Sequence, residues 1–132
     1  MGDNVLKGFL AAYSRKDMDG ALALVDPAAE FIAVRPQPSP DVSLYGTYHG
    51  HDGVRRFFGK LAEAFEPQRF TIDKVMEDAE NAVAWGHLTH RVRATGLVFD
   101  SAWAAVCAVK DGRITRYRFF EDTAALETSF GL

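Results

Sequence analysis

Apolar residues in the first half of the chain recur at helical spacing. One stripe, which predicts an N-terminal amphipathic helix, consists of Val5, Leu6, Phe9, Leu10 and Tyr13. A short second helix is expected after Asp17, a good N-cap residue, with Pro27 as its end. Its inward residues would be Met18, Ala21, Leu22 and Val25. A third helix is expected between Gly50 and Pro67, with an apolar face made of Val54, Phe57, Phe58, Leu61, Ala62 and Phe65.

The remaining pattern predicts strands. Residues 29–35 form the first, and the prolines in residues 36–44 indicate a stiff loop after it. Beyond Pro67 the apolar positions alternate, which predicts strands over 68–77, 82–95, 97–110 and 113–121. Turns are expected at 78–81, at Thr95-Gly96 and at Asp111-Gly112, the last a strong hairpin signal. A short terminal helix begins at Asp122. Helices followed by a long antiparallel meander predict a single α+β domain over residues 1–132, with the sheet curled around the helices.

Composition narrows the class of protein. The chain has 132 residues, of which 48% are hydrophobic and 25% charged, ordinary values for one soluble domain. A net charge of −3, with lysine and arginine spread along the chain, predicts no nucleic-acid partner. Polar Asp3, Asn4 and Lys7 argue against a signal peptide or membrane span at the start. A single cysteine, Cys107, cannot form an internal disulfide, which fits a reducing cytoplasm.

Two segments carry a family resemblance. Residues 45–58, Tyr-Gly-Thr-Tyr-His-Gly-His-Asp-Gly-Val-Arg-Arg-Phe-Phe, turn from an extended stretch into a helix, and the last strand ends in Phe-Phe-Glu-Asp-Thr at 119–123. With the order of elements, they resemble the SnoaL-like branch of the nuclear transport factor 2-like (ketosteroid isomerase-like) superfamily. The resemblance implies a conical fold, in which a curved antiparallel sheet wraps three N-terminal helices and encloses a pocket. The expected ligand is a small hydrophobic, polyketide-like or steroid-like molecule.

Asp122 is the candidate catalytic acid and base. The resemblance implies an aspartate that faces the cavity at the end of the last strand, and a carboxyl group at an apolar pocket has a raised pKa. The alternative is that Asp122 only caps the terminal helix, because Asp-Thr-Ala-Ala-Leu is a typical helix start. The two roles do not exclude each other.

Two histidines on one predicted strand compete for a place in the pocket. His87 and His90 are three residues apart, so a regular strand sends them to opposite faces. Small residues beside His90, namely Ala84 and Gly86, favour His90 as the pocket residue; a surface or dimer-interface position is the alternative for either. His49 and His51 could point the same way, but no third ligand is suitably spaced, so no metal site is expected.

Further pocket residues are drawn from arginines and aromatic residues. The candidate cavity charges are Arg35, Arg91 and Arg118, with solvated cross-strand ion pairs as the alternative. The candidate walls for a flat ligand are Tyr13, Phe57, Phe58 and Trp103, with plain core packing as the alternative.

Other catalytic sets known in the superfamily are not matched. The ketosteroid isomerase tyrosine falls on Phe9, its base near Ala33 or Arg35, and its second acid within 102–106, where no acid occurs. The only Arg-x-Asp, which limonene epoxide hydrolases use on a strand, is residues 15–17 between two helices.

The sequence thus supports two hypotheses. The first is a cofactor-free cyclase, isomerase or dehydratase in which Asp122 moves a proton while His90 or an arginine stabilises enolate charge. The alternative is a non-catalytic dimeric binding module. In both, we expect a homodimer through the outer face of the sheet, where Val83 and Trp85 would lie, and neither cofactor nor metal.

Overall fold

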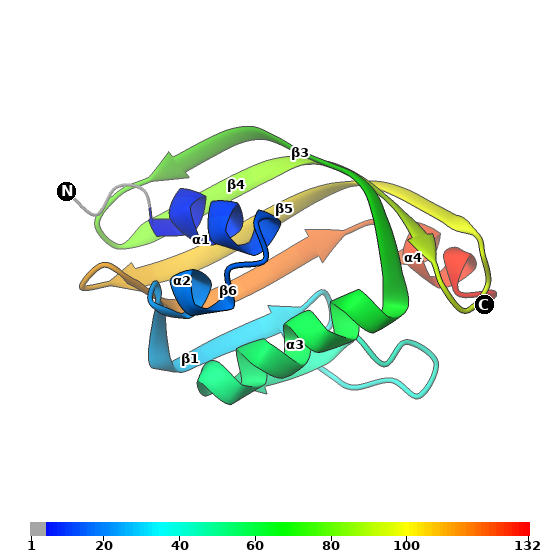
Figure 1. Cartoon of the computed structure of the whole chain (residues 1–132), viewed down its shortest axis with the longest axis horizontal. Coiled ribbons are helices and arrows are strands. Elements are labelled where there is room, and N and C mark those ends of the chain that lie inside the picture. Colours follow the sequence, from blue (N-terminus) through cyan, green and yellow to red (C-terminus); the bar gives the residue numbers. More distant parts are fainter. Residues whose placement is uncertain (1–4) are drawn as a thin grey trace.

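The helices and strands follow the predicted order, with one additional strand (Figure 1). The structure is a computed structural model that describes residues 5–132, so Asp3 and Asn4 lie outside the described part. The elements are α1 (Val5–Ser14), α2 (Met18–Leu22), β1 (Val25–Ala33), β2 (Gly46–His49), α3 (Gly50–Ala64), β3 (Phe65–Glu77), β4 (Asn81–Val92), β5 (Val98–Lys110), β6 (Arg113–Glu121) and α4 (Thr123–Ser129). No helix within residues 5–132 combines the length and hydropathy that crossing a membrane requires.

The six strands form one curved, open sheet in the order β2-β1-β6-β5-β4-β3. The α+β class and the curved sheet are confirmed. One pairing departs from the antiparallel expectation, since β1 and β6 run parallel. Parallel neighbours require a crossover connection. Here α3 carries the chain from β2 to the far edge of the sheet, and the meander β3 to β6 then returns to β1 (Figure 1).

Two prolines do not end helices as predicted. Pro27 lies inside β1. The register with β6 is irregular between Val25 and Glu30, so the missing N–H of Pro27 interrupts no regular series of hydrogen bonds between the strands. Pro67 lies inside β3, an edge strand with a register shift between Pro67 and Arg69. Proline is tolerated at both kinds of position. The added strand β2 pairs with Glu30–Ala33, a long-range contact that no local pattern reveals.

Local signals at the turns and caps are reproduced. The Asp17 carboxylate accepts a hydrogen bond of 2.9 Å from the Gly20 amide at the start of α2. Asp111 and Gly112 have φ values of 52° and 76°, as a two-residue hairpin of type I′ requires.

The core lies between the helices and the concave face of the sheet. The Phe9 ring of α1 is 5.7 Å from the rings of Phe31 and Tyr117 and 5.8 Å from that of Phe58, which ties α1 to β1, β6 and α3. Figure 1 shows α1, α2 and α3 on one side of the sheet. The other face of the sheet is left uncovered and includes Trp85, which is 39% exposed.

Candidate functional site

A cavity of about 610 Å³ opens between the helices and the concave face of the sheet. This size is typical of sites for small organic ligands. Most of the lining is apolar, and its aromatic members are Phe9, Tyr13, Phe57, Phe58, Phe65, Phe70, Tyr117 and Phe119. The arrangement can therefore enclose a flat hydrophobic molecule.

Glu121, the last residue of β6, is the carboxylic acid inside this cavity. It follows Tyr117 and Phe119 on the concave face, because alternate residues of a strand share a face. Among residues 5–132 no cation or hydrogen-bond donor contributes to its ionisation: burial alone raises the pKa of Glu121 from 4.5 to about 8. The carboxyl group is therefore mostly protonated at neutral pH, and it can give or take a proton close to that pH.

His90 also lines the cavity, from β4. Its ring packs 4.9 Å from the ring of Phe65, and its Nδ1 has no hydrogen-bond partner among the described residues. Burial lowers the pKa of His90 below its usual 6.5, so the imidazole is neutral at pH 7. A neutral imidazole supplies one donor and one acceptor.

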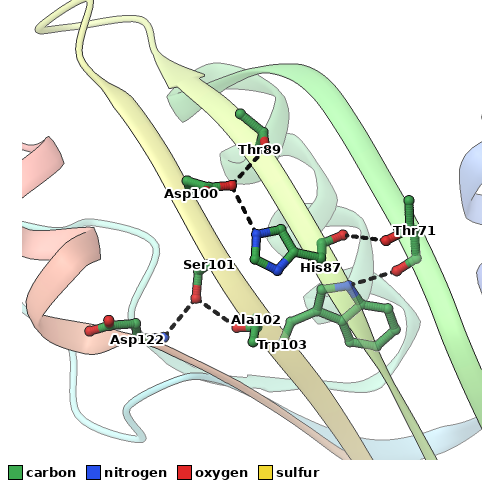
Figure 2. Close-up of polar contacts among 8 residues, drawn as sticks. All are labelled: Thr71, His87, Thr89, Asp100, Ser101, Ala102, Trp103 and Asp122. Carbon is green, nitrogen blue, oxygen red and sulfur yellow. Dashed lines mark hydrogen bonds and ion pairs between the residues drawn. The ribbon is translucent and has the colours of Figure 1, made fainter.

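His87 lies on the opposite, exposed face of β4 (Figure 2). Its Nε2 is 2.9 Å from Oδ1 of Asp100, which also accepts a 2.8 Å hydrogen bond from the Thr89 hydroxyl. The hydrogen bonds from Thr89 and His87 lower the pKa of Asp100. The two histidines thus belong to different faces, and only His90 reaches the cavity.

Asp122 lies outside the cavity, in contrast to the expectation that it faces the ligand. Its side chain is exposed and caps α4, with Oδ1 accepting a 3.0 Å hydrogen bond from the Ala125 amide. Its own amide donates to the Ser101 hydroxyl at 3.0 Å (Figure 2). The cap that the sequence indicated is present, whereas the carboxyl group in the cavity is that of the preceding residue.

The cap predicts a moderate and selective effect on stability. We expect Asp122→Ala to lower the free energy of unfolding by about 1 kcal/mol, because the Ala125 amide loses its partner. Asp122→Asn should change it by only a few tenths, since asparagine caps nearly as well. Urea unfolding of the two variants beside the unmodified protein measures the difference. Equal losses in both variants would contradict the capping role.

The three predicted cavity arginines lie elsewhere. Arg35 is paired with Glu127 at 3.5 Å, and Arg91 with Glu66 at 3.8 Å, both with exposed side chains. Arg118 stacks over Phe120, with its guanidinium carbon 4.8 Å from the ring centroid. None of them lines the cavity. Strand alternation places Arg91 and Arg118 on the outer face, where solvated pairs are the usual outcome.

The charges that do line the cavity, apart from Glu121, belong to its rim. They are Lys16, Asp17 and Arg93. Lys16 and Arg93 are exposed, and Arg93 donates from Nε to the Ala62 carbonyl at 3.1 Å. Within residues 5–132, no three histidine, cysteine, aspartate or glutamate side chains are grouped so that they could hold a metal ion.

Three of the four predicted aromatic wall residues, Tyr13, Phe57 and Phe58, line the cavity. Trp103 is not a lining residue but stacks against two of them. Its ring is stacked 4.8 Å from Phe70 and 5.5 Å from Phe119, and its indole N–H donates to the Thr71 carbonyl at 3.1 Å (Figure 2). It therefore supports the two lining residues.

Glu121 could have been found in the sequence. Tyr117 and Phe119 alternate with Arg116 and Arg118, which marks Tyr117 and Phe119 as the inward positions of this strand. Glu121 continues the apolar series and Asp122 does not, but the helix-cap pattern drew attention to Asp122. Arg93 gave no such signal, because its place at the rim depends on where α3 ends.

Known proteins resemble this chain in sequence and in structure. A family model, the SnoaL-like domain, matches residues 6–117. Patulin synthesis protein F of Aspergillus clavatus is 41% identical over 87 residues, and patulin biosynthesis cluster protein F of Penicillium expansum is 32% identical over 87 residues. Each match covers 63% of this chain and 44% of the relative, so the matched region spans less than half the length of those proteins.

The fold has solved counterparts. The crystal structure of an NTF2-like protein from Burkholderia xenovorans LB400 superposes with a TM-score of 0.83 at 28% identity, covering 96% of this chain and 93% of that one. An NTF2-like protein from Burkholderia thailandensis E264 gives a TM-score of 0.82 at 25% identity, covering 96% and 94%. The family match over residues 6–117, together with these structures, shows that the chain belongs to the SnoaL-like domain family of the NTF2-like superfamily.

Proposed function

We propose that this protein binds a small hydrophobic, polyketide-like molecule in the cavity and acts on it by cofactor-free proton transfer, with Glu121 as the general acid and base. The observation that carries the proposal is the Glu121 carboxyl group, which lines an aromatic cavity and has a pKa of about 8. The names of the curated relatives concern patulin synthesis, which supports a role in making a small molecule.

The reactions within reach are cyclisation, isomerisation and dehydration, each of which moves a proton near a carbonyl group. The ionised fraction of Glu121 takes a proton from carbon, and the resulting carboxylic acid returns it to carbon or oxygen. The apolar surroundings strengthen the base, because they stabilise its ionised form less than water does. Neutral His90 lies too far from Glu121 to contact the same enolate, but its ring can hydrogen-bond a second polar group of a ligand that extends along the cavity.

A generic carbon acid tests the proposal without knowledge of the natural substrate. 5-Nitrobenzisoxazole is a flat neutral molecule whose ring opens when a base removes its carbon-bound proton, and the product is coloured. We expect ring opening faster than in buffer, with a rate that rises through one ionisation near pH 8. A rate no higher than in buffer, with no carboxyl carbon titrating near pH 8 by ¹³C NMR, would overturn the proposal.

The second candidate function is that of a binding module without catalysis. It is favoured by the small number of polar groups in a mainly apolar lining. Such a module would bind 5-nitrobenzisoxazole but would not open its ring faster than buffer does at any pH.

We also propose a homodimer that forms through the outer face of the sheet. Adjacent strands β3 to β6 carry exposed apolar side chains there, namely Met76, Trp85, Val106 and Phe120. Contiguous apolar surface of this kind is typical of protein interfaces. We expect light scattering to give twice the 14.6 kDa chain mass at micromolar concentration, and Val106→Asp to give the monomer.

Leu97 provides the control for this prediction. It is 47% exposed but lies in the turn between β4 and β5, away from the patch. Leu97→Asp should therefore remain dimeric. A monomeric unmodified protein would refute the proposed interface.

A further inference from the structure

Glu121 and His90 are well separated on the cavity wall. Glu121 is in register with Trp103 of β5, which is in register with Gly86 of β4. His90 lies four residues further along β4, so the two side chains start roughly 13 Å apart along the strands and two strands apart across the sheet. Neither group affects the other's pKa. A ligand group at the Glu121 end of the cavity therefore does not meet His90 as well.

No cation within residues 5–132 contributes to the pKa of Glu121. Besides Glu121, the ionisable residues that line the cavity are Tyr13 of α1, Lys16 and Asp17 of the α1–α2 connection, His90 of β4, Arg93 directly after β4, and Tyr117 of β6. Tyr45, from the segment before β2, is the other tyrosine whose pKa Glu121 affects. The two cations among these residues, Lys16 and Arg93, are exposed at the rim and keep their hydration. Among the described residues, the cavity interior therefore contains no cation to pair with an anionic ligand group.

We infer that the cavity discriminates by charge: it takes a neutral polycyclic ligand with a hydrogen-bond acceptor directed at Glu121, and it excludes a ligand of the same shape that carries a carboxylate at that end. This inference rests on the binding part of the proposed function and specifies the charge of the ligand. The Glu121 carboxyl group is the donor, and the aromatic lining accommodates the rings. An anion placed there would be buried without a counter-ion.

Charge discrimination has a consequence for proton uptake. Free Glu121 has a pKa of about 8, and the neutral ligand needs the protonated form. The affinity for a ketone is therefore nearly constant below pH 7. Between pH 7 and pH 9 it falls by about tenfold, because the fraction of protein with a protonated Glu121 falls by that factor. At pH 9, binding takes up close to one proton from the buffer.

A matched pair of probes tests the inference. 2-Acetylnaphthalene and 2-naphthoate have nearly the same shape, but the first ends in a neutral ketone and the second in a carboxylate. Titration calorimetry gives the Kd of each at pH 7 and pH 9, and two buffers of different ionisation enthalpy give the proton uptake. We expect the ketone to bind at least tenfold more tightly than the naphthoate at pH 7, with proton uptake at pH 9.

Two variants complete the experiment. Glu121→Gln keeps a donor but cannot ionise, so it should bind the ketone with the same Kd at both pH values and without proton uptake. Arg91→Gln removes a positive charge from β4, outside the cavity, and should behave like the unmodified protein.

The outcomes separate the two ideas. If 2-naphthoate binds as tightly as the ketone at pH 7, the charge discrimination is wrong while the proposed function stands. If proton uptake persists in Glu121→Gln, the discrimination does not come from Glu121 and the inference is also wrong. If the unmodified protein binds neither probe, both the inference and the binding part of the proposed function are refuted.

Discussion

Replacement of Glu121 by glutamine is expected to lower the rate of proton transfer from 5-nitrobenzisoxazole by about 10²–10⁴-fold. Glutamine has the same size and shape as glutamic acid, so the cavity should keep its volume and its ability to bind the probe. It has no acidic or basic group that titrates near neutral pH. The loss should therefore appear in kcat, with KM little changed, and the ionisation near pH 8 should vanish from the pH–rate profile.

The adjacent carboxylate supplies the matched control. Asp122→Asn removes an acid next to Glu121 in sequence, but that acid is exposed and outside the cavity. Its rate and pH profile should equal those of the unmodified protein. A loss in Asp122→Asn with none in Glu121→Gln would restore Asp122 as the catalytic residue and contradict the assignment made from the cavity.

Glu121→Gln is also expected to raise the free energy of unfolding at alkaline pH, by about 2–4 kcal/mol at pH 9. The folded pKa of Glu121, about 8, lies above its unfolded value of 4.5. Between these values the folded state holds a proton that the unfolded state has released, so the free energy of unfolding falls as pH rises through this range. Above pH 8 the folded protein carries an unpaired carboxylate in the cavity, which glutamine avoids. The expected gain is set below the full linkage value because the cavity opens to water.

Denaturant unfolding of both proteins at pH 5, 7 and 9 measures this effect. The difference in unfolding free energy should be near zero at pH 5, intermediate at pH 7 and largest at pH 9. Asp122→Asn, whose carboxylate is solvated in the folded state, should show no comparable growth with pH. A Glu121→Gln protein that is no more stable than the unmodified one at pH 9 would mean that Glu121 is ionised and well solvated in the folded state.

The parts of the fold that depend on local chemistry could be predicted from the sequence. The stripe from Val5 to Tyr13, the cap at Asp17 and the Asp111-Gly112 turn each predicted an element that the structure contains. The errors occurred where a distant partner decides. β2 exists because β1 lies beside it, and Pro67 is accommodated because β3 is an edge strand. Neither fact is encoded within a few residues.

The site was predictable to the level of the strand but not of every side chain. Alternation assigned His90 and His87 to different faces, and the structure shows that only the first lines the cavity. At the end of β6, the same alternation competes with the start of α4: the cap geometry fixes Asp122 outward and leaves Glu121 on the concave face. Arg91 and Arg118 were misplaced although alternation excludes them from the cavity, since each is next to a residue that lines it, His90 or Tyr117.

Gly86 limits how the cavity can be reshaped by mutagenesis, because this position has no room for a side chain. A Cβ at this position would overlap the Thr71 carbonyl oxygen, the same oxygen that accepts the hydrogen bond from the Trp103 indole. Even alanine would push β3 outward and disturb the ring stack of Phe70, Trp103 and Phe119. Diversification of the ligand preference by mutagenesis should therefore leave position 86 fixed and vary half-buried lining residues outside this stack instead, such as Met18 and Leu61.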